Sequence, residues 1–154
     1  MADDTALRDL IERNRIAEVI NTLFVATDTR DWPRVRGCFA PVVTFDMTSL
    51  TRGAPQQMSP DEIVAGWQAG LQAIEAVHHQ IGNLSIVCTG GEASASCYGI
   101  AYHYRRTSTG KNTRAFVGSY DFHLLLLEQW RIDLFRFNAK FIDGNLELEK
   151  EPSA

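Results

Sequence analysis

Two adjacent histidines, His78 and His79, lie in a stretch rich in β-branched residues that predicts a strand. Successive side chains of a strand point to opposite faces, so only one of the pair can face the protein interior. The alternation places five residues together on one face: Val77, His79, Ile81, Asn83 and Ser85. Because this face also carries Asn83, we expect His79 to be the inward histidine. Histidine is the usual proton carrier near neutral pH, which makes His79 the candidate general base.

Asp28 is the carboxylate best placed to orient His79. It falls at the end of the first predicted helix, and a carboxylate bonded to one ring nitrogen of a histidine fixes which nitrogen is free to accept a proton. A simpler interpretation stays open on periodicity alone. An aspartate at a helix end is commonly a cap or turn residue, and a strand histidine is commonly a surface group or a hydrogen-bonded core group.

The patterns of several other chemistries are missing from the sequence. The four histidines have neither HxxxH nor HxH spacing, so we predict no metal site. Ser119 lacks the Gly-x-Ser-x-Gly turn of a hydrolase nucleophile. Gly90-Gly91 is predicted to be a hairpin turn rather than a phosphate-binding loop. We therefore expect a site that needs no cofactor.

Helices come first in the predicted order of elements. The first runs from Asp4 or Thr5 to about Asp28, and a short second helix begins at 31–33 and ends at 40–41. The third, at 59–74, opens with the capping box Ser59-Pro60-Asp61-Glu62. A short β-prone stretch, 42–47, lies between the second and the third.

Four long strands follow, at 77–88, 92–106, 112–127 and 130–141. Helices followed by antiparallel strands predict the α+β class. A long, twisted antiparallel sheet covered on one face by three N-terminal helices curls into an open cone, and the space between them is a pocket. We predict one domain over 1–154, with a core at about 5–145 and a charged, frayed tail at 146–154.

Bulk composition narrows the class of partner. The net charge of −4 argues against nucleic acid, which needs clustered lysine and arginine. The longest apolar run, 124–127, is far shorter than the roughly 20 residues of a membrane-spanning helix. Acidic residues stand at the N-terminus, where a secretory signal carries basic ones. The three cysteines form no CxxC pair, which fits reduced thiols and a cytoplasmic location. We expect a small-molecule ligand and neither a nucleic acid nor a membrane.

Several stretches of the sequence resemble scytalone dehydratase. They are TDTRDWPRVR (27–36), FAP (39–41), TFD (44–46), MSPDEIV (58–64) and HQIGN (79–83). The segment WRI (130–132) is similar to the broader SnoaL-like group, which has the fold of nuclear transport factor two and includes hexachlorocyclohexane dehydrochlorinase and ketosteroid isomerase. The likeness covers about 16–145 and implies the cone-shaped, cystatin-like fold. It indicates the reaction only loosely, because this scaffold hosts many activities.

The resemblance implies roles for individual residues. Asp28 and His79 match the carboxylate and the base that the dehydratase and the dehydrochlorinase share. His103 lies within one residue of the dehydratase's second pocket histidine, Ser119 resembles its pocket serine, and Asp121 stands where it has a pocket asparagine. The residues expected to contact a ligand are therefore His103, Asn83, Ser119 and Asp121 for its polar groups, and Phe24, Phe45, Trp67 and Phe137 as apolar walls.

The chain departs from the dehydratase at two positions. The family polarises a carbonyl through a water held by two tyrosines, and this chain has Thr27 and Met47 at those places. A tyrosine from another wall would have to replace them, and the sequence offers Tyr98, Tyr102 and Tyr104.

Two functions follow from these residues. A cofactor-independent lyase of the dehydratase type, or an isomerase, would use neutral His79, oriented by Asp28, to remove an acidic C–H proton from a small, largely apolar substrate. A non-catalytic domain would bind an apolar ligand in the same cavity, which the missing tyrosines favour. Partnership with an oxygenase subunit is a third alternative. The resemblance also implies a homo-oligomer, either a dimer or a trimer.

Overall fold

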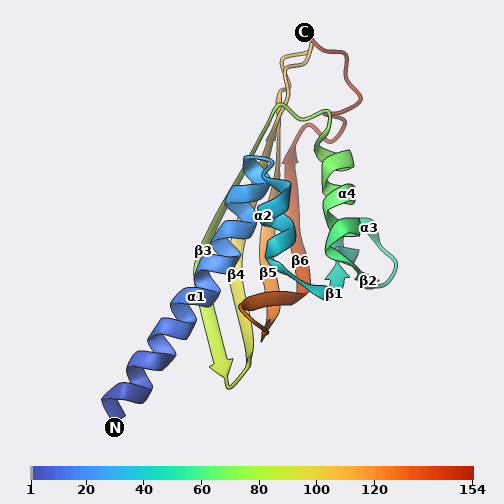
Figure 1. The fold of residues 1–154 in the computed structure, drawn as a ribbon. Helices are drawn as coiled ribbons and strands as arrows, with labels where there is room; N and C mark the ends of the chain where they lie inside the picture. Colours follow the sequence, from blue (N-terminus) through green and yellow to red (C-terminus); the bar gives the residue numbers. More distant parts are fainter. Residues whose placement is uncertain (1) are drawn as a thin grey trace.

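The computed structural model describes residues 2–154, with the side chains of residues 4–154, and has the predicted α+β architecture (Figure 1). The helices are α1 (Ala2–Asp28), α2 (Trp32–Gly37), α3 (Thr48–Thr51) and α4 (Pro60–Leu71). The strands are β1 (Phe39–Asp46), β2 (Gln56–Met58), β3 (Ala76–Thr89), β4 (Glu92–Tyr104), β5 (Thr113–Leu126) and β6 (Trp130–Gly144). The sequence missed the short α3 and β2. It also ended the second helix late, since residues 39–41 already belong to β1.

The six strands form one curled, unclosed sheet in the order β2-β1-β6-β5-β4-β3. Consecutive strands from β3 to β6 pair antiparallel, as their short turns require. The predicted antiparallel arrangement of the four long strands is confirmed, and the structure adds one parallel pair that the sequence did not show, β1 with β6, in which Phe45 lies opposite Phe135. A parallel pair needs a long connection, and here the whole segment between β1 and β6 provides it.

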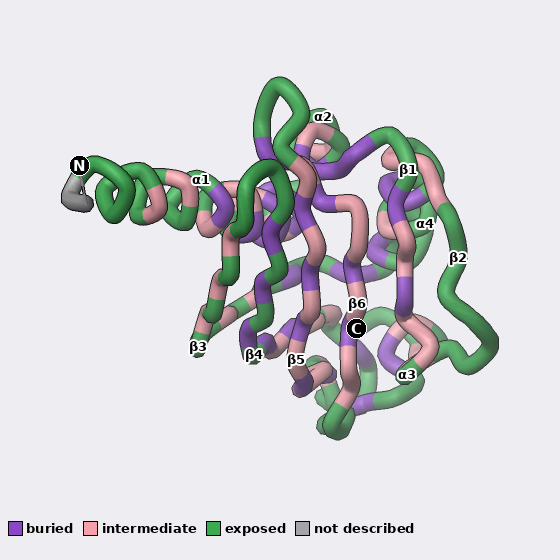
Figure 2. Tube along the Cα trace, turned by 90° about the horizontal axis from the view of Figure 1, so that it is seen from below, coloured by how far each residue is buried: buried purple, intermediate pink, exposed green. Residues whose placement is uncertain are grey.

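The later turns of helix α1 cover one face of the sheet (Figure 1). Ile16, Ile20 and Leu23, spaced three to four residues apart, are fully buried in the main core. The first turns of α1 extend beyond the sheet (Figure 2), and Leu7 and Leu10 in these turns are exposed. None of the described helices is long and apolar enough to cross a membrane.

Helix α4 begins as predicted. The hydroxyl of Ser59 accepts from the N–H of Glu62 at 3.3 Å, and the carboxylate of Glu62 accepts from the N–H of Ser59 at 2.7 Å, which completes the capping box. The helix buries Ile63 and Val64 and ends at Leu71, three residues earlier than expected.

The C-terminal segment, residues 145–154, folds back onto the sheet instead of fraying. Leu148 is 0% exposed and forms a small core with Leu71, Ile74 and Val77. The guanidinium of Arg105 donates to the carbonyl of Leu148 at 2.8 Å and to that of another segment residue, Glu151, at 2.7 Å. The expected frayed tail is therefore wrong for this stretch, because the buried Leu148, two arginines (Arg105 and Arg114) and a β-bridge between Thr107 and Ser153 hold it in place.

Candidate active site

His79 and Asp28 meet at the junction of β3 with the end of α1. Nδ1 of His79 lies 2.6 Å from Oδ1 of Asp28, and the backbone N–H of His79 donates to Oδ2 of the same carboxylate at 2.8 Å. Both side chains are largely shielded from water, with 14% and 16% of their surfaces exposed. An ionised carboxylate only accepts hydrogen bonds, so Nδ1 carries the proton and Nε2 keeps its lone pair. The arrangement presents an oriented base.

The local sequence explains why Asp28 reaches this position. Helix α1 ends there because Arg30 adopts a left-handed φ of 58° and the N–H of Asp31 caps the carbonyl of Ala26 at 2.8 Å. The Arg30 guanidinium also donates to the carbonyl of Ile74, which ties the turn to the residues just before β3. Strand β3 is an edge strand, so its outward N–H groups lack a strand partner, and Asp28 accepts from one of them.

His79 lines an aromatic cavity of about 210 Å³. This is smaller than the roughly 300–1,000 Å³ of drug-sized sites, so it suits a small ligand. Of the four predicted apolar walls, three line it, and Phe45 lies behind them, stacked on Phe135 with ring centroids 5.3 Å apart. The lining residues are Phe24, Thr27, Met47, Leu50, Gly66, Trp67, Gly70, Leu71, His79, Ala101, His103, Phe116, Tyr120, Phe135 and Phe137.

His103 is the second histidine of the cavity, as expected. In the β3–β4 ladder it pairs with Val77, while His79 pairs with Ala101, so the two histidines are diagonal neighbours on one face. Its pKa is lowered to about 4 by burial first, then by the charge of Arg114 and by His79. It is therefore neutral at physiological pH.

The prediction for Asn83 is wrong, because strand β3 contains a bulge. The pairing register with β4 shifts between Gly82 and Ser85, and Asn83 itself has a φ of 56°. Alternation holds as far as Ile81 and then reverses, so Asn83 is exposed and does not line the cavity.

Ser119 and Asp121 are also misplaced by the prediction. They share a face of β5, but it is the outer face of the sheet, where Asn138 donates to Asp121 at 2.8 Å. The inward face of β5 carries Phe116 and Tyr120. The prediction followed the polar residues, although the neighbouring positions of β5 are more apolar and so better suited to burial.

Tyr120 is one of several pocket residues that the sequence did not indicate, and the only one of them with a titratable side chain. Its ring packs between Phe24 and Phe137, with centroids 4.8 Å from each, and burial raises the pKa of its phenol. The ring lies over Gly99 of β4, its diagonal neighbour in the ladder, where an added Cβ would lie 2.2 Å from a Tyr120 ring carbon.

Thr27 and Met47 line the cavity and lack the phenolic hydroxyl expected there. Thr27 donates its hydroxyl to the carbonyl of Leu23 at 2.7 Å. The three tyrosines considered as replacements do not line the cavity and are 37–54% exposed: Tyr98, Tyr102 and Tyr104. Tyr120 is the phenol that the fold places in the pocket.

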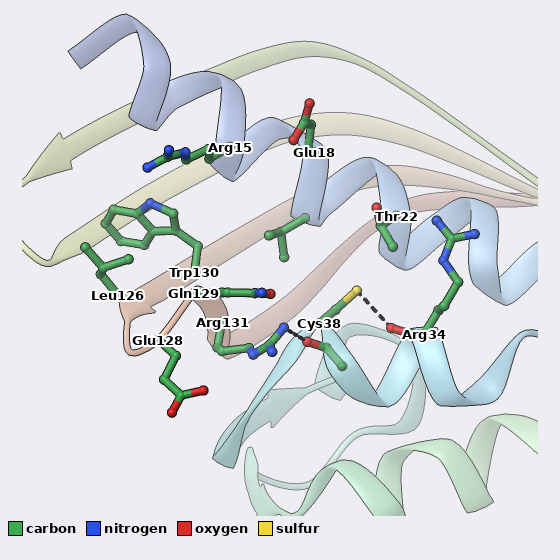
Figure 3. Close-up of a pocket in the computed structure, with 12 residues that line it drawn as sticks. Arg15, Glu18, Thr22, Arg34, Cys38, Leu126, Glu128, Gln129, Trp130 and Arg131 are labelled. Carbon is green, nitrogen blue, oxygen red and sulfur yellow. Dashed lines mark hydrogen bonds between the residues drawn. The ribbon is translucent and has the colours of Figure 1, made fainter. Parts of the chain in front are cut away.

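A larger hollow of about 660 Å³ lies between α1, α2 and the β5–β6 turn (Figure 3). Its walls carry charged side chains that include Arg15, Glu18 and Arg131, and they contain no histidine. The thiol of Cys38 donates to the carbonyl of Arg34 at 3.3 Å, and burial raises its pKa to about 11. This thiol is protonated at neutral pH and is no nucleophile. Of these two hollows, only the smaller aromatic cavity is lined by histidines.

A second His–Asp pair lies outside both hollows. Nδ1 of His123 is 2.7 Å from Oδ1 of Asp133, on β5 and β6, and both side chains are more exposed than those of the first pair. The two pairs have the same chemistry but only one faces a cavity, which makes the outer pair a matched control. Among residues 4–154, no group of three histidine, cysteine or acidic side chains is arranged to hold a metal ion.

Comparison with known proteins decides the family. The SnoaL-like domain model matches residues 8–136. The chain belongs to the SnoaL-like family. None of the curated proteins matches it in sequence.

Solved structures agree on the fold of this SnoaL-like protein. The Kfla4162 protein from Kribbella flavida has a TM-score of 0.86 at 20% identity, covering 92% of this chain and 99% of that one. A candidate scytalone dehydratase from Novosphingobium aromaticivorans has a TM-score of 0.75 at 14% identity, with coverage of 94% and 92%. A hexachlorocyclohexane dehydrochlorinase from Novosphingobium barchaimii has a TM-score of 0.73 at 10% identity, with coverage of 92% and 94%. At such identities the likeness establishes the fold alone.

Proposed function

We propose that this protein is a cofactor-independent lyase of the dehydratase type, or an isomerase, in which His79 is the general base. The observation that carries the proposal is the His79–Asp28 pair, 2.6 Å apart, at the wall of a small aromatic cavity. Two solved structures of the same fold are named as a dehydratase and a dehydrochlorinase, and both names describe eliminations.

Nε2 of His79 would take a proton from a carbon next to a carbonyl or a leaving group. Asp28 stabilises the imidazolium that forms, because its charge lies against Nδ1–H in a site with little water. In an elimination, the imidazolium then returns its proton to the departing hydroxide. In an isomerisation, it returns the proton to another carbon. General-base help of this kind contributes about 10²- to 10⁴-fold, and positioning in the cavity contributes the rest.

Tyr120 would supply the hydrogen bond that Thr27 and Met47 cannot. Its phenol is neutral at physiological pH, since burial raises its pKa, and a neutral phenol can donate to a carbonyl oxygen as negative charge develops. The aromatic walls limit substrates to small compounds with a largely apolar body.

Hydrogen exchange at carbon tests the base directly. Small ketones with acidic C–H groups, such as 2-tetralone and cyclohexanone, would be incubated with the protein in D₂O, and deuterium uptake measured by mass spectrometry. We expect catalysed uptake with the wild type and with His123→Gln, whose histidine belongs to the outer pair, and loss of catalysis in His79→Gln. Equal catalysis by His79→Gln and the wild type would overturn the assignment.

A non-catalytic binding domain is the second candidate, favoured by the presence of Thr27 and Met47 in the cavity. The two candidates differ in a simple way. A binding domain would show saturable shifts of the cavity residues in NMR spectra with the same ketones, without any enhanced deuterium uptake at any pH.

We further propose that the protein acts in the cytoplasm as a homo-oligomer. Its three cysteines are unpaired thiols, and the outer face of the sheet exposes large side chains such as Tyr98 and Phe141 that another copy could cover. Light scattering of the purified chain measures the assembly, and a monomer at all concentrations would contradict it.

A further inference from the structure

A second polar cluster begins in the cavity and ends in the C-terminal segment. Nδ1 of His103 lies 3.1 Å from Nη2 of Arg114, which stands directly opposite it in the β4–β5 ladder. Arg114 is 9% exposed, and its guanidinium carbon lies 4.9 Å above the ring of Phe116. Its two terminal nitrogens both donate to the carboxylate of Glu149. The side chain of Arg114 is therefore held by His103, by the ring of Phe116 and by Glu149.

Only one donor–acceptor assignment is possible for the His103–Arg114 hydrogen bond. A guanidinium has donors only, so Nδ1 of His103 must accept, and the single proton of the neutral ring must be on Nε2. Protonation of Nδ1 would set two N–H groups against each other next to a buried positive charge. His79 has the opposite arrangement, because its Nδ1 faces a carboxylate.

We propose that Arg114 and Glu149 are positioning residues that hold His103 as a fixed Nε2–H donor for an oxygen atom of the ligand. The cavity then contains two histidines of opposite polarity: Nε2 of His79 accepts a proton, and Nε2–H of the neutral His103 donates a hydrogen bond. A ligand with an acidic C–H and a carbonyl or hydroxyl oxygen a few bonds away matches both. That the Nε2–H of His103 binds an oxygen of the ligand rests on the proposed function, whereas the position of the proton on Nε2 does not.

The charges around His103 support the same proton position. Burial lowers its pKa most, and Arg114 on β5 and His79 on β3 lower it further. Glu149 in the C-terminal segment and Asp28 on α1 act in the opposite direction, yet the pKa remains at about 4. Glu149 is itself kept ionised, since the hydrogen bond from Arg114 lowers its pKa against the effect of burial.

The C-terminal segment thus becomes part of the site without touching the ligand. Glu149 can reach Arg114 only because Leu148, its neighbour, is fully buried and Arg105 binds the segment's carbonyls. The segment that the sequence presents as a charged tail fixes the proton of a cavity histidine.

The test is the nitrogen-15 NMR spectrum of the histidine rings, which distinguishes protonated from unprotonated nitrogens. Between pH 5 and 8 we expect His103 to carry its single proton on Nε2. The neutral forms of His79 and His123, which lie beside carboxylates, should carry theirs on Nδ1. His103→Gln assigns the signals. A proton on Nδ1 of His103 in the wild type would overturn the proposal. This measurement needs no variant of Arg114, so it does not depend on whether such a variant folds.

Two variants distinguish the effect of the Arg114–Glu149 pair on the pKa of His103 from the effect of burial. In Arg114→Met the titration midpoint of His103 should rise toward the ordinary 6.5 and the preference for Nε2–H should weaken. In Glu149→Gln the midpoint should stay low or fall, because the charge that raises it is gone. Unchanged His103 signals in folded Arg114→Met would show that burial alone holds the proton. Deuterium uptake is not used here, so this proposal and the function of His79 can fail independently.

Discussion

Replacing Asp28 by asparagine should leave His79 in place but remove its ability to accept a proton at Nε2. The carboxylate of Asp28 accepts two hydrogen bonds, from the backbone N–H of His79 at 2.8 Å and from Nδ1 at 2.6 Å. An asparagine has one acceptor oxygen and one NH₂ group, so it can satisfy only one of these donors. The backbone N–H cannot change its role, whereas an imidazole can move its proton to the other nitrogen. Asparagine therefore keeps its oxygen on the backbone and turns its NH₂ toward Nδ1.

The consequence is a histidine of the wrong tautomer. Nδ1 becomes an acceptor, the proton moves to Nε2, and the lone pair that faced the cavity is lost. We expect catalysed deuterium uptake to fall about 10²- to 10⁴-fold, the range that general-base help supplies. Losing a charge-assisted hydrogen bond should lower the free energy of unfolding by only about 1–3 kcal/mol, so the variant should still fold.

The matched control is Asp133→Asn in the outer pair. It breaks a contact of nearly the same length, 2.7 Å between His123 and Asp133, with no cavity beside it. Its uptake rate should equal that of the wild type. Nitrogen-15 spectra would report the tautomer of His79 in the same samples. If folded Asp28→Asn retained wild-type uptake after His79 had moved its proton to Nε2, the reasoning would be refuted.

Three further outcomes are expected. Tyr120→Phe should reduce uptake about 10²-fold, the usual cost of one oxyanion donor, while the melting temperature stays close to the wild type; unchanged uptake would remove Tyr120 from the site. His103 has a pKa of about 4 in the fold and 6.5 as its ordinary value, so the unfolded chain binds more protons between these values. The free energy of unfolding should therefore fall by about 3 kcal/mol as the pH drops through this range, and denaturant titrations of His103→Gln should lack this contribution. Leu148→Ala should cost about 2–5 kcal/mol and expose the C-terminal segment to proteolysis, which a tail that frays in the wild type would not show.

The sequence predicted the parts of the site that depend on local order. The end of helix α1 near Asp28 and the inward side of His79 are short-range patterns that the sequence predicted. The contact between the two residues was implied by the family resemblance, because periodicity alone left other interpretations open. Asn83 failed because a bulge depends on how β3 fits β4, and one residue of shift reverses every later side chain.

Other features were set by distant contacts. Alternation divides β5 into two faces but does not say which one is buried, and Tyr120 was missed because polarity was followed instead of apolar content. The parallel pairing of β1 with β6 joins segments about ninety residues apart, which no local pattern reports. The C-terminal segment looked frayed because it has many charged residues and few apolar ones, yet the burial of Leu148 and the hydrogen bonds from Arg105 and Arg114 hold it in place.

Helix α1 also sets the angle at which Asp28, the proposed partner of His79, approaches the imidazole. Ile16, Ile20, Leu23 and Ala26 are fully buried, and Asp28 follows two residues after Ala26. One inserted residue between Leu23 and Asp28 would swing the carboxylate by about 100° around the axis and advance it about 1.5 Å, away from the imidazole. Shortening the projecting first turns would leave that angle untouched. The number of residues between the buried turns and Asp28, more than the length of the helix, therefore determines where the carboxylate lies.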